Sequence, residues 1–418
     1  WPLFPGYVFV RFEPMDASKV LAIPGSVQVI GVAGRPAAIP DEEIELALDT
    51  ADRLKAEFRA GVPTLHLPHK TIFLIFLDKS TRTRNSFEAG MTQLGGHAHF
   101  IDSESSQIAH GESPKDMGII LSSYGHGIAI RHDVVPGMGQ AYMREVAQWA
   151  SVPVINMQCD VDHPCQTLAD LMTIREEFGK DLSGLKIAVS WAYAPSYVKP
   201  MSVPQGLIML MTRFGMNVTL AHPPEYTLMD EPMRLARENA AQSGGKFEVV
   251  DSMEEAFADA DIVYPKSWGV EALFSKPDEA MKIARQYRNW ICDEAMMARA
   301  KESAIYMHCL PADRGYEVTD PVIDGPQSRV YPEAENRLHT AKALMAQMLE
   351  STPDQRPDRI AEAVTALLAL PFGHKPFRTV VDHTGVGPEI ERYNIVLHDV
   401  TRTVLTNFGI ADMLCLNA

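Results

Sequence analysis

An apolar segment that stops abruptly at a run of polar residues constrains this 418-residue chain more than any other feature. Residues 71–77 are almost entirely apolar and rich in β-branched and aromatic side chains, which indicates a strand buried on both faces. Seven polar residues, 78–84, follow, and then Phe87, Met91 and Leu94 recur with helical spacing. A strand, a polar turn and a helix start present backbone N–H groups and the positive end of a helix dipole, which favours anion binding.

The polar turn also carries the side-chain donors that an anion site needs. Ser80, Thr81 and Thr83 supply hydroxyl groups. Arg82 and Arg84 supply guanidinium groups, whose planar fork suits phosphate oxygens. On these residues alone, a helix cap with two solvated arginines explains the pattern equally well.

Charge and cysteine usage narrow the classes of partner. The net charge of −16 argues against a nucleic-acid partner, which needs a basic surface, but it leaves room for a small anionic substrate in a local positive pocket. The five cysteines are scattered and form no C-x-x-C pair, so a cytoplasmic location is favoured over a disulfide framework or a zinc site. No apolar run in the sequence has the length of a membrane span and no signal-peptide pattern is present, so no membrane partner is predicted.

From residue 71 onward, strands and helices alternate, which predicts an α/β protein with two doubly wound parallel-sheet domains. The expected strands are 71–77, 97–102, 127–130 and 152–156, then 185–191, 217–221, 247–250, 261–264 and 304–308. The expected helices are 115–124, 164–178, 204–214, 231–242, 253–258, 275–287 and 332–349. A further helix begins at Asp41 and ends before Gly61, with an apolar stripe formed by Ile44, Leu48, Ala51, Leu54 and Phe58.

The two ends of the chain differ in character from the centre. Residues 1–44, with Pro-Gly turns at 5–6 and 24–25, resemble the second half of the N-terminal domain of NusG-type transcription factors. Residues 351–418 resemble the C-terminal segment of some short-chain dehydrogenases. That tail has neither the Gly-rich nucleotide turn nor the Tyr-x-x-x-Lys pair of those enzymes, so dehydrogenase activity is not predicted.

Polar side chains gather at the carboxyl ends of the predicted strands, where ligands bind in α/β sheets. These positions are 80–84, Arg131, His163 with Gln166, 264–268 and 308–311. Two of the groups are cationic, and one places a histidine and an amide one helical turn apart. Such a set suits a phosphorylated substrate with a carbonyl group better than glycoside hydrolysis or metal-assisted hydrolysis.

Three motifs, in this order and spacing, resemble the signatures of the aspartate/ornithine carbamoyltransferase superfamily. They are Ser80-Thr81-Arg82-Thr83-Arg84, His163-Pro164-Cys165-Gln166 and His308-Cys309-Leu310-Pro311. The likeness covers roughly residues 45–350 and implies two domains. Residues 45–180, completed by a helix at 333–350, would bind carbamoyl phosphate, and residues 181–332 would bind the amine substrate.

The resemblance implies a role for each residue around carbamoyl phosphate. The phosphate group would be held by Ser80, Thr81, Arg82 and Thr83. Arg131 would bridge the phosphate and the carbonyl oxygen, and His163 would donate to that oxygen. Gln166 would orient the carbamoyl amide, and Arg337 would reach the same place from the last helix. Without the resemblance, His163 is equally well explained as a helix cap, and Arg84 is interpreted as structural.

The same resemblance implies a mechanism. A neutral amine would attack the carbamoyl carbon while Arg131, His163 and Thr83 stabilise the developing oxyanion, and phosphate would leave against Arg82. Domain closure would exclude water. Neither a metal nor an organic cofactor is expected, and the partners would be carbamoyl phosphate and an amino-acid-like amine.

Residues expected near the amine depart from the ornithine enzymes of the superfamily, whose Asp-x-x-x-Ser-Met-Gly motif is replaced here over 261–269. The residues expected to bind the amine are Lys266, Ser267, Trp268, Cys309 and Leu310. Lys266 could pair with a substrate carboxylate or be a solvated lysine, and Cys309 could equally be a buried thiol. The sequence around Lys266, with the Pro-rich segment 191–204, resembles the knotted branch, which includes the N-acetylornithine and N-succinylornithine enzymes and a bacterial group without a settled substrate.

Residues 103–114 resemble the loop that neighbouring subunits of this superfamily lend to one another's active sites. His110 occupies the place of a catalytic lysine in the aspartate enzymes. The resemblance therefore implies a homotrimer with shared active sites.

The leading interpretation is a carbamoyltransferase that acts on an amino-acid-like amine. One alternative is ornithine carbamoyltransferase proper, and another is a regulatory or composite protein with an idle core and grafted ends. The second arises because superfamily members begin with a helix that packs on the last helix, and here NusG-like residues are expected in its place.

Overall fold

The computed structural model describes residues 41–133, 135–196 and 198–350, which fall almost entirely within the unit Glu45–Thr352. The NusG-like and dehydrogenase-like predictions concern residues 1–44 and 351–418, nearly all of which lie outside the described residues. None of the helices in the described stretches combines the length and apolar character of a membrane span.

Four parallel strands form the first sheet, in the order β2-β1-β3-β4. They are β1 (Thr71–Phe76), β2 (His97–Asp102), β3 (Gly127–His132) and β4 (Val154–Cys159). β3 runs two residues beyond the predicted 127–130, and β4 is displaced from the predicted 152–156 toward the C-terminus. The extension of β3 matters for the site, because it makes Arg131 part of the strand.

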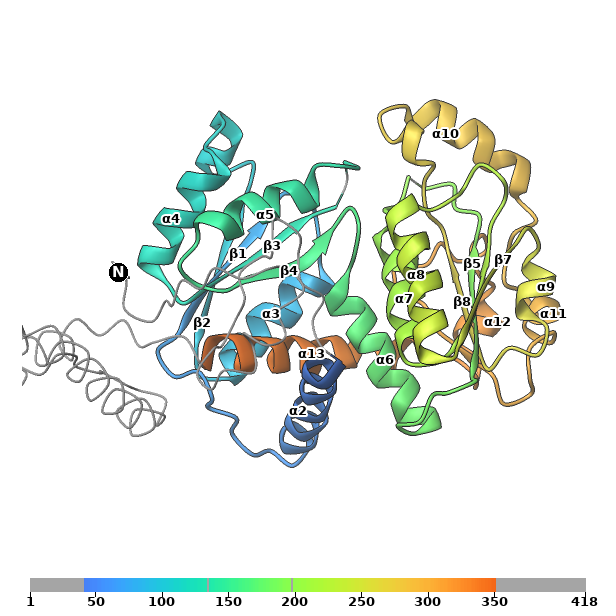
Figure 1. Ribbon diagram of the computed structural model, residues 1–418, viewed down its shortest axis with the longest axis horizontal. Coiled ribbons are helices and arrows are strands. Elements are labelled where there is room, and N and C mark those ends of the chain that lie inside the picture. The colour runs from blue at the N-terminus through green and yellow to red at the C-terminus, as the bar shows by residue number, and fades with distance from the viewer. Residues whose placement is uncertain (1–40, 134, 197, 351–418) are drawn as a thin grey trace, which may run out of the picture. The chain divides into compact units, whose positions relative to one another are not determined.

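Helices cover both faces of this sheet (Figure 1). They are α3 (Arg82–Gln93), α4 (Pro114–Tyr124), α5 (Gly139–Trp149), α6 (Pro164–Phe178) and α13 (Val330–Glu350). On one face, Phe73 and Ile130 pack with Met117 of α4 and Val146 of α5 in a fully apolar cluster. On the other face, α13 packs against α3 and α6. Gly127 permits this approach, because a Cβ there would lie 2.4 Å from Leu349.

Helix α5 was not predicted, and its start explains why. Its N-cap, Met138, makes no side-chain capping bond. Instead, the carboxylate of Asp160, in the loop after β4, accepts from the backbone N–H groups of Gly137 and Gln140 at 2.6 and 2.8 Å. The cap therefore comes from a residue distant in sequence, which local start signals cannot reveal.

Five parallel strands form the second sheet, in the order β7-β6-β5-β8-β9. They are β5 (Lys186–Trp191), β6 (Asn217–Ala221), β7 (Lys246–Val250), β8 (Ile262–Lys266) and β9 (Ile305–Tyr306). The helices of this half are α7 (Ser202–Arg213), α8 (Asp230–Ser243), α9 (Met253–Phe257), α10 (Pro277–Ala284), α11 (Glu294–Met297) and α12 (Asp320–Ile323). α7 and α8 cover one face and α9 the other, so the predicted α/β class with two parallel sheets is confirmed.

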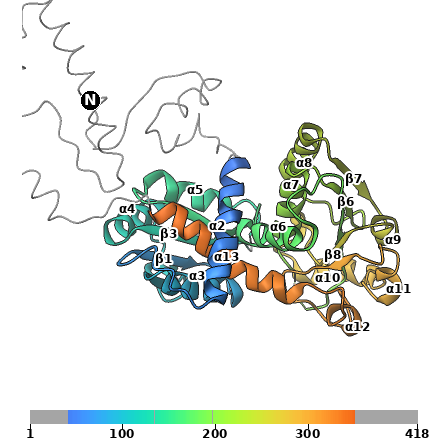
Figure 2. The same cartoon turned by 90° about the horizontal axis from the view of Figure 1, so that it is seen from below.

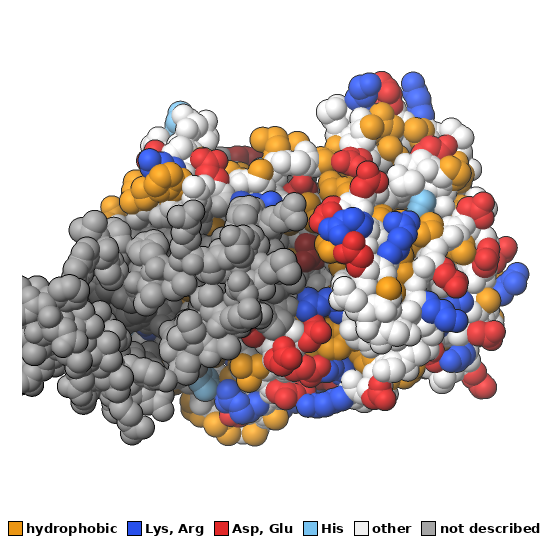
Figure 3. All heavy atoms as spheres, in the orientation of Figure 1, with side chains coloured by type: hydrophobic (Ala, Val, Ile, Leu, Met, Phe, Trp, Pro, Cys, Tyr) orange, Lys and Arg blue, Asp and Glu red, His pale blue; other side chains and the backbone are white. Residues whose placement is uncertain are grey.

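The face of this half that Figure 3 shows is mixed in charge. On the face in Figure 3, acidic and basic side chains are interspersed and do not form a broad basic area. On α8, for example, Arg234 makes ion pairs with Glu231 and with Glu238.

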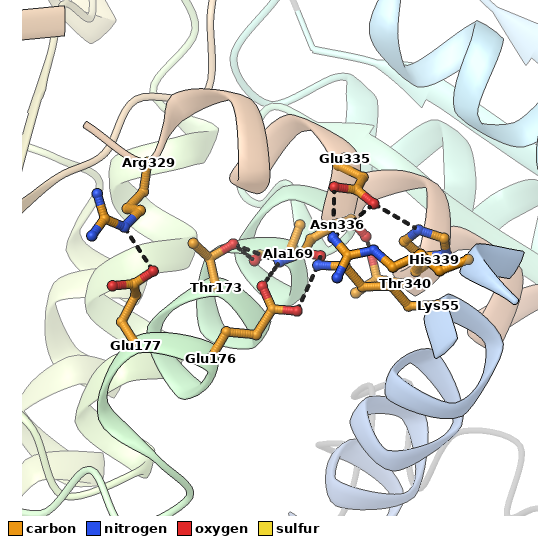
Figure 4. Close-up of polar contacts among 11 residues, drawn as sticks. Lys55, Ala169, Thr173, Glu176, Glu177, Arg329, Glu335, Asn336, His339 and Thr340 are labelled. Carbon is orange, nitrogen blue, oxygen red and sulfur yellow. Dashed lines mark hydrogen bonds and ion pairs between the residues drawn. The ribbon is translucent and has the colours of Figure 1, made fainter. Parts of the chain in front are cut away.

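Helix α2 (Asp41–Arg59) contacts the last helix through a polar network (Figure 4; see also Figure 2). The ammonium of Lys55 donates to Glu176 on α6 and to Asn336 on α13, both at 2.6 Å, and Lys55 is only 5% exposed. A helix upstream of the first strand therefore does contact the last helix, contrary to the expectation that NusG-like residues had replaced it. Phe58 departs from the predicted apolar stripe, since it is 46% exposed.

Each sheet has one point where the chain reverses its direction of travel across the strands. In the first sheet it lies between β1 and β3, because β2 is added on one side and β4 on the other. In the second it lies between β5 and β8. Such points leave a crevice at the carboxyl ends of the strands, which is where ligands bind in open α/β sheets.

Candidate active site

Thr83 lies at the centre of the crevice in the first sheet. It is fully buried in the first turn of α3, directly after β1, and its backbone N–H donates to the hydroxyl of Ser80 at 3.3 Å. Its hydroxyl oxygen accepts from Arg337 at 2.5 Å and from Arg131 at 3.2 Å. Because a hydroxyl has two lone pairs and one proton, the two arginines leave the Thr83 proton available for a further partner.

Arg131 is fixed by a two-bond contact with a buried carboxylate. Its Nε and Nη2 donate to the two oxygens of Asp133 at 3.1 and 3.0 Å, and its Nη1 also donates to Ser80 at 3.3 Å. A register shift between β3 and β4 falls at Ile130/Arg131, and such irregularities re-aim side chains. Burial, opposed by Arg131, raises the pKa of Asp133 to about 7, and the nearby Asp78 adds to the rise.

Two more guanidinium groups reach the same place. Arg337 of α13 is 4% exposed, and its Nε has no hydrogen-bond partner among the described residues. Burial, together with the charges of Arg131 and Arg82, lowers the pKa of Arg337 to about 10. Arg82 donates to the carbonyl oxygen of Leu310 at 2.5 Å, in the loop after β9. Three close cations at a helix N-terminus form a strong anion site.

His163 is the N-cap residue of α6, as the helix-cap interpretation predicted, but its side chain makes no capping bond. Its side chain is buried, and its Nδ1 has no hydrogen-bond partner in the described part of the chain. Burial, reinforced by Arg337, Arg131 and Arg82, holds the pKa of His163 well below its ordinary value. The imidazole is therefore neutral at physiological pH and can donate one hydrogen bond.

Gln166 lies one turn along α6 and is fully buried. Its amide nitrogen donates to Asp170 at 2.7 Å and to Glu333 at 2.8 Å. Its carbonyl oxygen has no hydrogen-bond partner among the described residues. This end of Gln166 therefore acts as an acceptor toward an N–H group.

In the second sheet, Lys266 ends β8 at the crevice beside β5. It is 6% exposed, its ammonium donates to the carbonyl oxygen of Ser267 at 2.7 Å, and it makes no ion pair with the described residues. Burial, together with the charge of Lys199, lowers the pKa of Lys266. A buried ammonium bonded to one carbonyl oxygen gains from an anionic partner.

Glu317 organises the surroundings of Lys266. Its carboxylate accepts from Lys199 at 2.5 Å and from the backbone N–H of Ser267 at 2.7 Å, and it lies 3.5 Å from the imidazole of His308. Burial acts against its charge, but His308, Lys266 and Lys199 outweigh it and hold the pKa of Glu317 well below its ordinary value. Glu317 therefore makes an ion pair with Lys199, whereas Lys266 makes none with the described residues.

The remaining predicted positions vary in their surroundings. The indole N–H of Trp268 donates to the carbonyl oxygen of Tyr226, and the ring is 1% exposed, so its side chain packs in the second domain. Leu310 has a φ of 52°, and its carbonyl oxygen accepts a hydrogen bond from Arg82. Cys309 beside it is buried. His110 ends a short 3₁₀ helix, Gln107–His110, on the exposed loop after β2.

Two residues of the predicted polar turn lie outside the cluster. Arg84 pairs with Glu88 at 2.9 Å and stacks over the ring of Phe100 at 3.6 Å, which fits a structural role. Thr81 is exposed at the N-cap of α3.

Sequence reasoning missed the acidic residues that hold the site. Asp170 and Glu333 could have been found, because each lies four residues along a helix from a predicted site residue, Gln166 and Arg337 respectively. Glu317 gave no such signal, since it reaches Lys199 across 118 positions of sequence.

Comparison with known proteins agrees with this geometry. Residues 35–176 match the family described as aspartate/ornithine carbamoyltransferase, carbamoyl-P binding domain, and residues 199–348 match its Asp/Orn binding domain. Residues 2–48 match the family of transcription termination factor NusG, as the sequence of that end suggested.

The match with individual relatives extends over most of their length. YgeW of Escherichia coli K12, provisionally named as a carbamoyltransferase, is 40% identical over 357 residues, covering 77% of this chain and 89% of that protein. Ornithine carbamoyltransferase of Thermococcus kodakarensis is 39% identical over 323 residues, covering 76% of this chain and 97% of that protein.

Solved structures show the same fold. Ornithine carbamoyltransferase from Pyrococcus furiosus superposes with a TM-score of 0.67 at 37% identity, covering 75% of this chain and 95% of that one. Acetylornithine transcarbamylase complexed with acetylcitrulline superposes with a TM-score of 0.69 at 34% identity, covering 74% of this chain and 96% of that one. This chain therefore belongs to the aspartate/ornithine carbamoyltransferase family.

Proposed function

We propose that this protein transfers the carbamoyl group of carbamoyl phosphate to the amine of an amino-acid-like substrate and releases phosphate. One observation carries the proposal. Buried polar atoms with no partner among the described residues, on His163, Gln166 and Arg337, accompany the available Thr83 proton in one crevice. Together they offer donors for an anion and a carbonyl oxygen, and an acceptor for an amide N–H, which is the hydrogen-bonding pattern of carbamoyl phosphate.

The contacts supply each step of the transfer. Arg82 and the N-terminus of α3 receive the phosphate group, which leaves against them as the new C–N bond forms and takes up the proton that the amine loses. Arg131, His163 and Thr83 donate to the carbonyl oxygen as it gains charge during attack. Because His163 is neutral, it serves as a hydrogen-bond donor without adding a fourth full charge beside three arginines.

We also propose that Lys266 binds a carboxylate of the amine substrate. It is the buried cation of the second crevice that makes no ion pair in the described residues, while Lys199 is balanced by Glu317. The departure from the ornithine pattern over 261–269 favours a modified amino acid over ornithine itself. The likeness to acetylornithine transcarbamylase points the same way, and the similar identity to ornithine enzymes keeps ornithine as the alternative.

Other features predicted from the sequence belong to the same proposal. They are the knotted path through 191–204, a homotrimer that shares sites through His110, a cytoplasmic location, and domain boundaries at 45–180 and 181–332. A backbone bond from Gly269 to the carbonyl oxygen of Lys199, at 2.9 Å, ties the Pro-rich segment to β8 and supports a rigid rim there. The idle-core alternative is weakened, because the motif residues keep their mutual bonds and α2 contacts α13.

An amine panel tests the proposal. Phosphate release from carbamoyl phosphate is measured with ornithine, N-acetylornithine, N-succinylornithine, 2,3-diaminopropionate derivatives, putrescine and aspartate. We expect amine-dependent release that Arg82→Ala lowers by about 30-fold or more, since loss of a charge-assisted donor costs ~2 kcal/mol or more in a transition state. Arg84→Ala is the matched control, because this neighbour points to Glu88 and Phe100. Folded protein without release for any amine would refute the proposal.

A further inference from the structure

Beneath Gln166 lies a buried carboxyl pair to which the transfer reaction assigns no task. Asp170 on α6 and Glu333 on α13 are 0% and 1% exposed. The two residues are 163 positions apart in sequence. Both accept from the amide nitrogen of Gln166, at 2.7 Å for Asp170 and 2.8 Å for Glu333. Burying two acids side by side is costly, so the pair calls for a function.

The pair determines which end of Gln166 faces the crevice. Carboxylate oxygens accept hydrogen bonds, and an amide has donors only on its nitrogen, so the nitrogen must face Asp170 and Glu333. The carbonyl oxygen of Gln166 then lies on the other side, without a partner among the described residues. If the two acids did not hold it, the amide could turn over and present N–H groups instead.

Glu333 also connects Gln166 to the second domain. It accepts from the hydroxyl of Tyr264 on β8 at 3.1 Å and from the backbone N–H of His308, after β9, at 2.9 Å. The same carboxyl group therefore sets the position of the Gln166 amide and of the loop that begins at His308.

Burial disfavours the ionised forms of Asp170 and Glu333. The groups that face it are Arg337, Tyr264, Gln166 and the backbone N–H of His308. Burial raises the pKa of Glu333 well above its ordinary value, and Asp170 raises it further. Burial also raises the pKa of Asp170, to about 7, so near neutral pH the two acids retain at least one proton between them, and Arg337 faces the remaining negative charge.

We propose, on the basis of the function proposed above, that Glu333 and Asp170 are positioning residues that select carbamoyl phosphate over acyl phosphates. By holding the nitrogen of Gln166, they aim its carbonyl oxygen at the –NH₂ group of the carbamoyl moiety. An acyl phosphate has a methyl or methylene group at that position and cannot donate to Gln166. Selection then depends on two acids that do not touch the substrate.

A pair of stable ligands isolates this contact. Phosphonoacetamide and acetonylphosphonate differ only in an –NH₂ or a –CH₃ group beside the same carbonyl and phosphonate. Titration calorimetry gives the affinity of each, and their ratio reports the hydrogen bond to Gln166. One hydrogen bond contributes roughly 0.5–1.5 kcal/mol, so we expect the wild-type protein to prefer phosphonoacetamide by about 2- to 13-fold.

Three variants separate positioning from folding. Glu333→Ala should bring the ratio close to one while acetonylphosphonate still binds with nearly wild-type affinity. Asp170→Asn should keep the ratio, because its amide N–H can replace the shared proton while its oxygen still accepts from Gln166. Glu335→Gln is the control on the same helix, since Glu335 pairs instead with Arg59.

The outcomes distinguish the two proposals. A Glu333→Ala protein that weakens both ligands equally, or that keeps the wild-type ratio, overturns the positioning role. If Glu333→Ala does not fold, Asp170→Leu takes its place, with loss of the ratio supporting the role and an unchanged ratio overturning it. A folded wild-type protein that binds neither ligand would refute the carbamoyl phosphate site itself.

Discussion

Replacing Thr83 by valine removes the hydroxyl at the centre of the anion site and keeps the shape of the side chain. This hydroxyl accepts from Arg131 at 3.2 Å and from Arg337 at 2.5 Å, and its proton is left for the substrate. The variant therefore removes one donor to the ligand and the acceptor that holds two guanidinium groups in place. Thr83→Ser is the matched control, because it retains the hydroxyl.

The size of the effect follows from these contacts. A hydrogen bond to a charged group contributes about 1.5–3 kcal/mol, so phosphonoacetamide should bind Thr83→Val about 10- to 150-fold more weakly. A buried donor left without an acceptor costs about 1–3 kcal/mol, which sets the expected loss of unfolding free energy. Arg131 keeps its two bonds to Asp133, so we expect the lost unfolding free energy to come mainly from Arg337, whose guanidinium loses its acceptor.

Calorimetry with phosphonoacetamide measures the first effect and urea unfolding the second. Thr83→Ser should bind within about threefold of the wild-type protein and lose about 1 kcal/mol for the deleted methyl group. If Thr83→Val binds the ligand as tightly as Thr83→Ser, then the hydroxyl does not donate to the phosphate or the carbonyl group, and the argument from its lone pairs is wrong.

Three further predictions concern other parts of the structure. Lys266→Met should raise KM for the amine by about tenfold or more, because the buried ion pair between Lys266 and the substrate carboxylate is lost, and it should leave the affinity for phosphonoacetamide unchanged. An equal change in KM for the amine and in the inhibition constant of phosphonoacetamide, both measured by steady-state kinetics, would contradict this. The folded pKa of Asp170, about 7 against 3.8 ordinarily, adds stability at low pH that is lost as pH rises through 7. Urea unfolding should therefore show the wild-type protein losing about 2.5 kcal/mol between pH 5 and pH 7.5 relative to Asp170→Asn, and an equal change in both proteins would refute the shift. Lys55→Met should cost about 1–3 kcal/mol of unfolding free energy, because it leaves the buried carbonyl oxygen of Asn336 without its donor, whereas Lys180→Met, at an exposed pair, should have no measurable effect.

Much of the site was visible in the sequence because its residues follow buried strands. The polar turn after β1 predicted an anion site, and the structure places Thr83 there with Ser80 as its local partner. The pattern of alternating strands and helices predicted two parallel sheets, and the polar ends of the strands do lie at the two crevices. These features depend on neighbours in sequence, for which periodicity and turn chemistry are informative.

Long-range contacts could not be predicted in the same way. The spacing of Glu333 from Arg337 marks it as a candidate, but its partner Gln166 lies 167 positions away, and only the fold brings the two together. The end of β3 was placed too early because Arg131 is polar, although it continues the strand beside β4. The neutral state of His163 depends first on its burial and then on three arginines, which come together only in the fold.

The most direct test of the account follows the carbamoyl carbon itself. Carbamoyl phosphate labelled with ¹³C is incubated with the protein and N-acetylornithine, N-succinylornithine or ornithine, and the carbon is observed by NMR. We predict that the signal moves to a ureido carbon in step with phosphate release, and that Arg82→Ala slows the transfer by about 30-fold or more while Arg84→Ala retains it. Phosphate release without a ureido product for any of the amines in the panel, or equal transfer by the Arg82→Ala protein, would contradict the proposed carbamoyl transfer at this site.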